Sequence, residues 1–187
     1  MGSKPPFEFV APLARFVLFW AGVVLTIMGA STVDRLQRPD LDACRANGDC
    51  VQVSLVALQF SWSEADYAAL KNWSEATRRR TTEALRADSW MLVPGYVLVL
   101  SILCGAAARR GDQRTYRRPG VVIAWLVFAG GAADLAENTL IGMALESPAG
   151  VVLTALAVVA CVKWALFGLG LLYATLAPAS RYVMGRA

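Results

Sequence analysis

Four long apolar blocks most constrain how this chain of 187 residues can fold. Each block is about as long as the roughly 20 residues that a helix needs to cross a bilayer. Only helices and closed barrels satisfy the backbone polar groups in hydrocarbon, and the alternation typical of barrel strands is absent here. The sequence therefore predicts an all-α integral membrane protein, a four-transmembrane-helix bundle with spans at residues 16–33, 89–108, 119–145 and 149–176.

The composition argues against several functional classes. Apolar residues make up 57% of the chain and charged residues 17%, whereas soluble domains are nearer half apolar and a quarter charged. The chain has no histidine, which is the commonest metal ligand and general base. We therefore expect a non-enzymatic protein with no catalytic residues, no metal site, no bound cofactor and no nucleic-acid partner. The lipid bilayer is the partner that the composition does predict.

The arginines predict the orientation. The loop 109–118 contains five arginines and one aspartate, whereas the loop 146–148 contains no basic residue. The positive-inside rule places loop 109–118 and both termini in the cytoplasm. We expect a multi-pass protein of a bacterial plasma (inner) membrane, divided into an N-terminus with the first span (1–33), an outer segment (34–88), the second span (89–108), a basic cytoplasmic loop (109–118), the third span (119–145), a short outer loop (146–148), the fourth span (149–176) and a cytoplasmic tail (177–187).

The first half of the outer segment predicts a disulfide loop and an extended stretch. Cys44 and Cys50 flank an Asn-Gly turn in the compartment where disulfides persist. A bridge between them would stabilise the fold by about 2 kcal/mol in the chain-entropy model. Val51, Val53 and Leu55 alternate with polar or small residues, a pattern typical of a short strand or of an extended stretch on the membrane surface.

The second half of the outer segment predicts an amphipathic helix that continues into the second span. Ser61-Trp-Ser-Glu64 has the pattern of a capping box, so we expect the helix to begin there and to run past Ala87. Pro94 is expected to kink it, because proline removes one backbone hydrogen bond and clashes with the preceding turn. Tyr67 and Trp73 on this segment are candidate contact aromatics for a partner, or they pack on the bundle.

Three charged residues interrupt the apolar blocks. Asp134 and Glu137 lie in the third span and Lys163 lies in the fourth. A charge at mid-bilayer costs about 2.5–3.5 kcal/mol on insertion scales, so such groups normally pair or line a wet cavity. Counted from the span centres, Lys163 lies near the midplane and Asp134 roughly 5 Å further out. We therefore predict a buried Asp134–Lys163 ion pair.

The residues around this pair predict a ligand pocket. Glu137 and Asn138 lie one turn from Asp134, on its face of the helix. Asp88 at the outer mouth of the second span and Tyr96 below it are placed to close the same pocket. One hypothesis is an ion pair that only fixes packing. The other is a pocket, formed by Asp88, Tyr96, Asp134, Glu137 and Asn138, that binds a lipid-like or small polar ligand or supports a protein partner at the outer face.

Two further functions stay open. A small transporter or ion-conducting protein would use Asp134, Glu137 and Lys163, and it would need a homo-oligomer because four helices leave little room for an aqueous path. A membrane thiol oxidoreductase is the third class, because four helices with an outer cysteine pair resemble vitamin K epoxide reductase. That family requires a CxxC motif, whereas Cys104 and Cys161 stand alone in their spans.

The polar residues carry a closer resemblance. An outer amphipathic helix leads to Asp88 and then Tyr96 on the second span, followed by Asp134-x-x-Glu137-Asn138 on the third. In this respect residues 51–143 resemble a loose group of uncharacterised bacterial four-span membrane proteins. The resemblance implies the fold and marks these polar residues, but it implies no activity.

Overall fold

The computed structural model describes most of the chain. It covers residues 4–38, 54–60, 63, 65, 67, 73–109 and 114–184, with side chains for all of these except 114–117 and 178–184. Within these ranges the protein is helical and contains no strand. The helices are α1 (Pro12–Gln37), α3 (Leu55–Gln59), α5 (Glu75–Ala87), η2 (Asp88–Leu92), α6 (Val93–Arg109), α7 (Arg114–Glu146) and α8 (Gly150–Met184).

Four of the helical segments are long and apolar enough to cross a membrane, as the sequence predicts. They are α1, the continuous segment Glu75–Arg109 formed by α5, η2 and α6, then α7, and α8. The helices extend beyond the predicted spans. α1 covers Pro12–Gln37, whereas the sequence predicts a first span at residues 16–33. α7 begins at Arg114, within the segment expected to be a loop, and α8 ends at Met184, within the expected tail.

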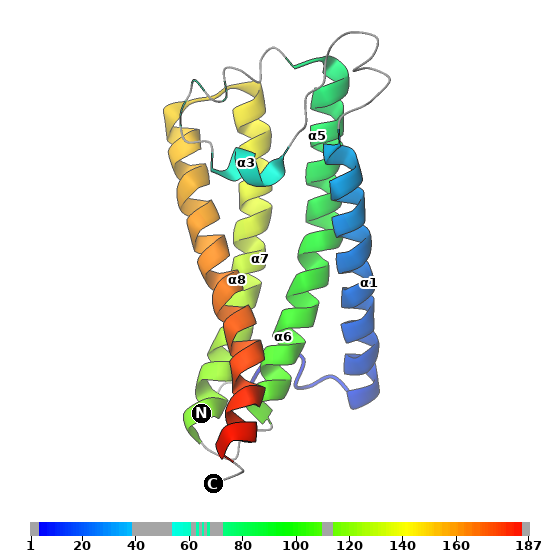
Figure 1. The fold of residues 1–187 in the computed structure, drawn as a ribbon, viewed down its shortest axis with the longest axis vertical. Coiled ribbons are helices and arrows are strands. Elements are labelled where there is room, and N and C mark those ends of the chain that lie inside the picture. The colour runs from blue at the N-terminus through cyan, green and yellow to red at the C-terminus, as the bar shows by residue number, and fades with distance from the viewer. Residues whose placement is uncertain are drawn as a thin grey trace.

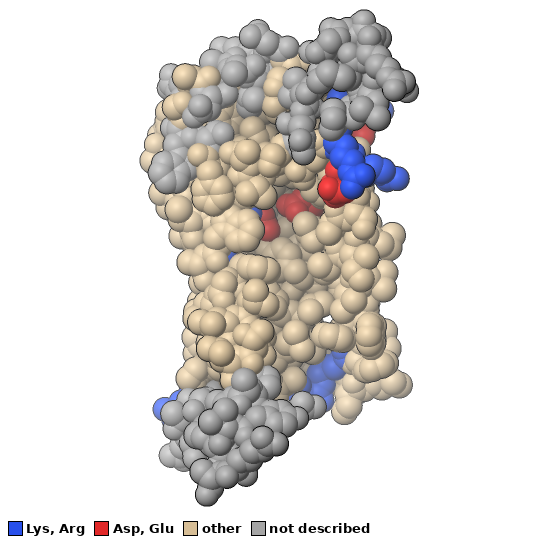
Figure 2. Space-filling model, viewed as in Figure 1, with Lys and Arg blue, Asp and Glu red and all other residues tan. Residues whose placement is uncertain are grey.

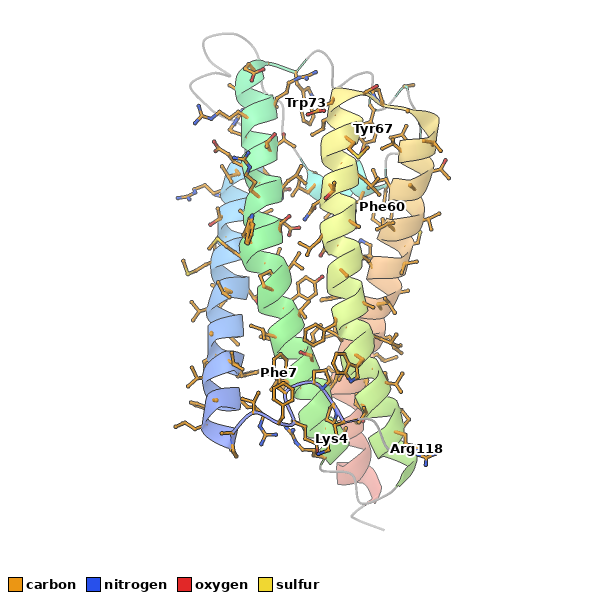
Figure 3. All side chains as sticks on the ribbon, turned by 180° about the vertical axis from the view of Figure 1, so that it is seen from behind. Lys4, Phe7, Phe60, Tyr67, Trp73 and Arg118 are labelled. Carbon is orange, nitrogen blue, oxygen red and sulfur yellow. The ribbon has the colours of Figure 1, made fainter. Side chains whose placement is uncertain are left out.

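The four long segments run side by side along the long axis of the molecule (Figure 1). α1 packs against α5, η2 and α6, whereas α8 packs against α6 and α7. α1 and α8 therefore form two separate edges of the bundle. The short helix α3 lies across one end, which we call the α3 end (Figure 1). Lys4 and Arg118 lie at the opposite end (Figure 3).

Glycines bring α1 and the second long segment into close contact. A Cβ atom at Gly29 would lie 2.6 Å from the backbone nitrogen of Leu92, and one at Gly95 would lie 2.6 Å from the backbone nitrogen of Thr26. No side chain fits at these positions without moving a backbone. Small residues allow this kind of approach between helices in membranes, where apolar burial does not drive helix association.

Leu55–Gln59 form the helix α3, so the prediction of a strand or extended segment is wrong at Leu55. Val51 and Val53, the other residues of that prediction, lie outside the described residues. Ser54 has an extended backbone, and its side chain accepts a hydrogen bond from the Ala57 amide, which caps α3. Leu55 and Leu58 are both buried. These two leucines are three residues apart and lie on one face of a helix, and this spacing overrides the alternation further upstream.

The helix that leads into the second span begins at Glu75, and the predicted start at Ser61 is wrong for this helix. Ser74 has an extended backbone with φ −61° and ψ 153°, and its side chain accepts a hydrogen bond from the Thr77 amide. An N-cap of this kind starts a new helix and excludes a continuous one. Most of the predicted capping box, Ser61, Trp62 and Glu64, lies outside the described residues.

The predicted disulfide between Cys44 and Cys50 also lies outside the described residues, so it stays a prediction. Among the residues that the structure describes there is no disulfide, and Cys104 and Cys161 are free thiols. Cys104 is buried on α6, where its thiol lies 3.5 Å from the Gly170 carbonyl. Cys161 is exposed on α8.

The bundle has two apolar clusters along its length. The first lies toward the α3 end and includes Tyr67, which is 1% exposed and donates a hydrogen bond to the Leu58 carbonyl at 2.9 Å, with Trp73 packed against the cluster. Both aromatic residues lie at that end (Figure 3). They therefore pack on the bundle. The second cluster consists of Val93, Val97, Leu100, Cys104, Ile123, Ala124 and Val127.

The segment before α1 folds back over the end opposite α3. The Phe7 ring packs 5.8 Å from the Phe128 ring, and Trp125 Nε1 donates to the Lys4 carbonyl at 3.0 Å. Phe7 has a φ of 61°, which reverses the chain before Pro12 starts α1. Nothing in the sequence pattern predicts this return.

Candidate functional site

The buried charged side chains of Asp134, Glu137 and Lys163 lie between the two apolar clusters. Lys163 on α8 reaches across to α7, where its Nζ atom lies 3.2 Å from Asp134 Oδ1 and 2.7 Å from Glu137 Oε2. All three side chains are at least nine-tenths buried, and Glu137 is fully buried. The structure thus brings together the two residues of the predicted pair and adds Glu137 as a second partner of the lysine.

Tyr96 extends this group from α6. Its hydroxyl donates a hydrogen bond to Asp134 Oδ2 at 2.8 Å. Each oxygen of Asp134 therefore has one donor, Lys163 on the first and Tyr96 on the second. Glu137 is less well satisfied, because its Oε1 atom is buried and has no hydrogen-bond donor among the described residues.

Asp88 and Asn138 form a second polar pair nearby. Asn138 Nδ2 on α7 donates to Asp88 Oδ2 at 2.6 Å, and it also lies 3.1 Å from the Ser89 hydroxyl. Asp88 is 8% exposed, and no lysine or arginine of the described residues lies within ion-pair distance of it. Its carboxylate is therefore bound by an amide and makes no ion pair with any described residue.

A π-helical turn orients Asp88 toward Tyr96. The Val93 amide donates to the Asp88 carbonyl five residues earlier, as in a π-helix. Residues eight apart in a regular α-helix point about 80° away from each other. The wider turn reduces the rotation per residue, so Asp88 and Tyr96 line the same pocket. Pro94 is the sequence feature behind the turn, because it lacks the amide hydrogen that a regular helix requires.

Asp88, Tyr96, Asp134 and Lys163 form the base of a pocket of about 260 Å³. Its walls come from α1, α6 and α8, and α3 covers it. In the space-filling view, acidic side chains are visible inside a hollow on the face between the α1 and α8 edges (Figure 2). The lining residues are Thr26, Val33, Gln37, Leu55, Val56, Gln59, Asp88, Leu92, Tyr96, Asp134, Lys163, Trp164 and Phe167. Of the five predicted pocket residues, Asp88, Tyr96 and Asp134 line it, while Glu137 and Asn138 support it from α7.

The short helix α3 connects the two edges of the bundle over this pocket. The Leu55 amide donates to Gln37 Oε1 on α1 at 3.4 Å, and Trp164 Nε1 on α8 donates to Gln59 Oε1 at 3.1 Å. Gln59 is buried although it is polar. Its hydrogen bond to Trp164 explains this burial, because buried amides normally have a partner.

The aromatic wall on α8 was not predicted from the sequence. Trp164 and Phe167 both line the pocket, with ring centroids 5.9 Å apart, and the Phe167 ring lies 5.4 Å from the Tyr96 ring. Phe167 follows Lys163 by four residues, so helical periodicity places it on the lysine's face. This spacing is the sequence feature that indicates Phe167 as a pocket residue. Trp164 and its hydrogen-bond partner Gln59 lie 105 residues apart in sequence, and no local pattern indicates such a contact.

The arrangement can hold a ligand. Among the residues that the structure describes, no three His, Cys, Asp or Glu side chains are grouped to hold a metal ion. The buried group contains three carboxylates, from Asp88, Asp134 and Glu137, and one ammonium, from Lys163. It combines a polar base with apolar and aromatic walls, as small-molecule sites do.

Comparisons of the chain with protein-family models, with curated proteins and with solved structures gave no match.

Proposed function

We propose that this protein is a multi-pass membrane protein that binds a ligand with a polar head and an apolar body in the pocket under α3. The observation that carries the proposal is the pocket itself, with Asp88, Asp134 and Lys163 at its base and apolar side chains around them. The protein acts in this proposal as a binding protein with no catalytic step.

The outer faces of the long helices support a membrane location. On α1, large apolar side chains are half or more exposed, including Phe16, Trp20, Val24 and Ile27. α8 has the same character, with Val151, Val158 and Leu172 each more than half exposed. Apolar surface continuing over the length of two helices costs free energy in water, whereas hydrocarbon accommodates it.

The basic residues around the short connection between α6 and α7 support the proposed orientation. Arg109 ends α6, and Lys4 and Arg118 lie at the end opposite α3 (Figure 3). Under the positive-inside rule this end faces the cytoplasm of a bacterial inner membrane, with both termini there. The α3 end and the pocket then face the outer half of the bilayer. Cysteine labelling from outside after reduction should reach Cys44 and Cys50, and failure of this labelling would reverse the orientation.

The place where the pocket opens favours a ligand that comes from the bilayer. The hollow lies between the two edges α1 and α8, beneath α3 (Figures 1 and 2). Val33, Leu55, Val56 and Leu92 give it an apolar wall next to the buried charges. A ligand with an apolar body can enter there from the membrane while its polar head reaches Asp88.

The other half of the bundle argues against an ion path through one protomer. Between the pocket and the cytoplasmic end, α6 and α7 bury an apolar cluster that includes Val97, Leu100 and Val127. Each of these three side chains is at most 7% exposed. An ion crossing this cluster would lose its hydration without polar replacement, which is costly. If the protein transported ions, their path would therefore have to lie at an interface between copies of the chain.

A pair of tryptophan substitutions on α3 tests the proposal. Val56 lines the pocket and is exposed, whereas Ala57 is also exposed but does not line the pocket. Val56→Trp should fill the mouth of the pocket, and Ala57→Trp adds the same bulk beside it. Purified in a sugar-headed detergent, the wild type and Ala57→Trp should gain thermal stability from an extract of the native membrane.

Val56→Trp should gain less stability from the same extract, because its pocket is occupied by the new side chain. An equal gain for both variants would show that the lipid acts on the outer surface, and it would contradict the proposed site.

A further inference from the structure

We infer that the pocket selects a cationic head, an ammonium group carried on an apolar body. This inference rests on the proposed function and specifies the class of ligand. It comes from three features of the described part of the pocket, namely more buried carboxylates than ammonium groups, a carboxylate with no described cation in ion-pair contact, and an aromatic wall.

Among the residues that the structure describes, the buried charges around the pocket do not balance. Lys163 is shared between Asp134 and Glu137, with its Nζ atom within 3.2 Å of both carboxylates. Asp88 adds a third carboxylate, and it is 8% exposed. A buried carboxylate is expensive unless a proton or a cation neutralises it. A ligand with a positive head would supply the missing charge.

Asp88 is placed to receive such a head. It lines the pocket, whereas Glu137 does not. Asn138 holds one oxygen of Asp88, Oδ2, at 2.6 Å, and no described side chain donates a hydrogen bond to the other oxygen, Oδ1. Asp88 therefore keeps acceptor capacity that an ammonium group can use, and hydrogen bonds to charged groups are stronger than neutral ones.

The aromatic wall suits a cation for a second reason. Tyr96 and Phe167 line the pocket with their rings edge to face at 5.4 Å, and Trp164 lies beside them. Aromatic faces attract ammonium groups, and cages of aromatic rings recognise substituted ammonium ligands. The Lys163 ammonium already lies 5.1 Å from the Trp164 ring centroid, which shows that this wall accommodates a positive charge. An anionic head would meet two carboxylates, Asp88 and Asp134, against one ammonium group, Lys163, and would be repelled on balance.

A series of single-chain amphiphiles that differ only in the head tests the inference on the full-length protein. Hexadecylamine, hexadecyltrimethylammonium, hexadecanol and hexadecanoate are titrated into the wild type in maltoside micelles, and thermal stabilisation gives an apparent affinity for each. The two cationic probes should bind at least tenfold more tightly than hexadecanol, and hexadecanoate should bind most weakly. Butylamine, which lacks the apolar body, should not stabilise the protein at the same concentration.

Two variants assign the effect to the pocket. Asp88→Asn removes the charge while its amide oxygen can still accept from Asn138, and it should weaken the cationic probes about 10- to 100-fold. Glu75→Gln removes a carboxylate of the same helical segment that does not line the pocket, and it should leave the affinities unchanged. The head-group series on the wild type needs no variant, so the test stands even if Asp88→Asn does not fold.

The outcomes separate this inference from the proposed function. Tighter binding of hexadecanol or hexadecanoate, weakened by Val56→Trp, would support the pocket and overturn the cationic head. Tighter binding of butylamine than of hexadecylamine would point to a free amine as the ligand and would also overturn it. If no amphiphile stabilises the wild type, the proposed function fails as well.

Discussion

Replacing Lys163 by methionine should destabilise the protein more than removing either of its two carboxylate partners. The lysine has contacts of 3.2 Å to Asp134 and 2.7 Å to Glu137, and its side chain is 7% exposed. Methionine has a similar length and carries no charge. Lys163→Met would leave two buried carboxylates without a cation, and breaking a buried pair in this way costs about 3–5 kcal/mol.

The smaller cost of Asp134→Asn follows from the same geometry. Asparagine still accepts the Tyr96 hydroxyl, and Lys163 keeps Glu137 at 2.7 Å. The variant loses one charged hydrogen bond, so we expect its free energy of unfolding to fall by about 2 kcal/mol. The triple variant Lys163→Met, Asp134→Asn and Glu137→Gln removes the three charges that contact one another and leaves only Asp88 of the buried group. It should recover most of the loss, because a neutral replacement of a buried ion pair is often nearly neutral in stability.

The assay is reversible unfolding of the purified protein in mixed micelles with increasing SDS, followed by far-ultraviolet circular dichroism. Lys4→Met is the matched control, because Lys4 is exposed at the opposite end and its side chain has no role in the charged group. The control should stay within about 0.5 kcal/mol of the wild type. Equal losses for Lys163→Met and Asp134→Asn, or a triple variant as unstable as Lys163→Met alone, would refute the shared-lysine account.

The remaining predictions concern the glycines at the helix surfaces and the buried hydroxyl of Tyr67. Gly29→Ala would place a Cβ atom against the backbone of η2 and should lower the free energy of unfolding by about 1–3 kcal/mol in the same assay. As a control, Gly142→Ala meets no atom within 4 Å and should stabilise α7 by about 0.5–1 kcal/mol. An unchanged stability of Gly29→Ala would contradict the close approach of α1. Tyr67→Phe should cost about 1 kcal/mol through the lost hydrogen bond to Leu58. Burial, and to a lesser degree the charge of Glu137, raises the pKa of Tyr67 to about 12 from 10.0, so the folded state favours the protonated phenol. The wild type should therefore lose stability relative to Tyr67→Phe as the pH rises from 10 to 12, and parallel stability profiles over that range would contradict the burial of this hydroxyl.

The charged residues were predictable because a charge inside an apolar block is conspicuous and needs a partner. The short loop between the third and fourth spans implied that Asp134 and Lys163 lie on neighbouring helices, and the structure places them in contact. The second contact of Lys163, with Glu137, was not predicted, because it depends on the direction in which the lysine side chain extends. Such a direction is set by packing and not by sequence spacing.

The cover of the pocket was not predictable, for a different reason. The alternation up to Leu55 favoured an extended segment, whereas the buried pair Leu55 and Leu58 holds a helix against the bundle. Its position depends on Gln37 from α1 and on Trp164 from α8, which are far from it in sequence. Contacts of this range are decided by tertiary packing, which overrides local propensity.

Native mass spectrometry most directly tests whether the pocket holds a ligand from the membrane. The wild type, Val56→Trp and Ala57→Trp are each extracted from the membrane with their surrounding lipid by a polymer. Each protein is then released into the gas phase, and the molecules that stay bound are identified by mass. We predict one retained amphiphile with an ammonium group on the wild type and on Ala57→Trp, and its loss from Val56→Trp. Retention of the same molecule by all three proteins, or a wild type that carries none, would contradict the account.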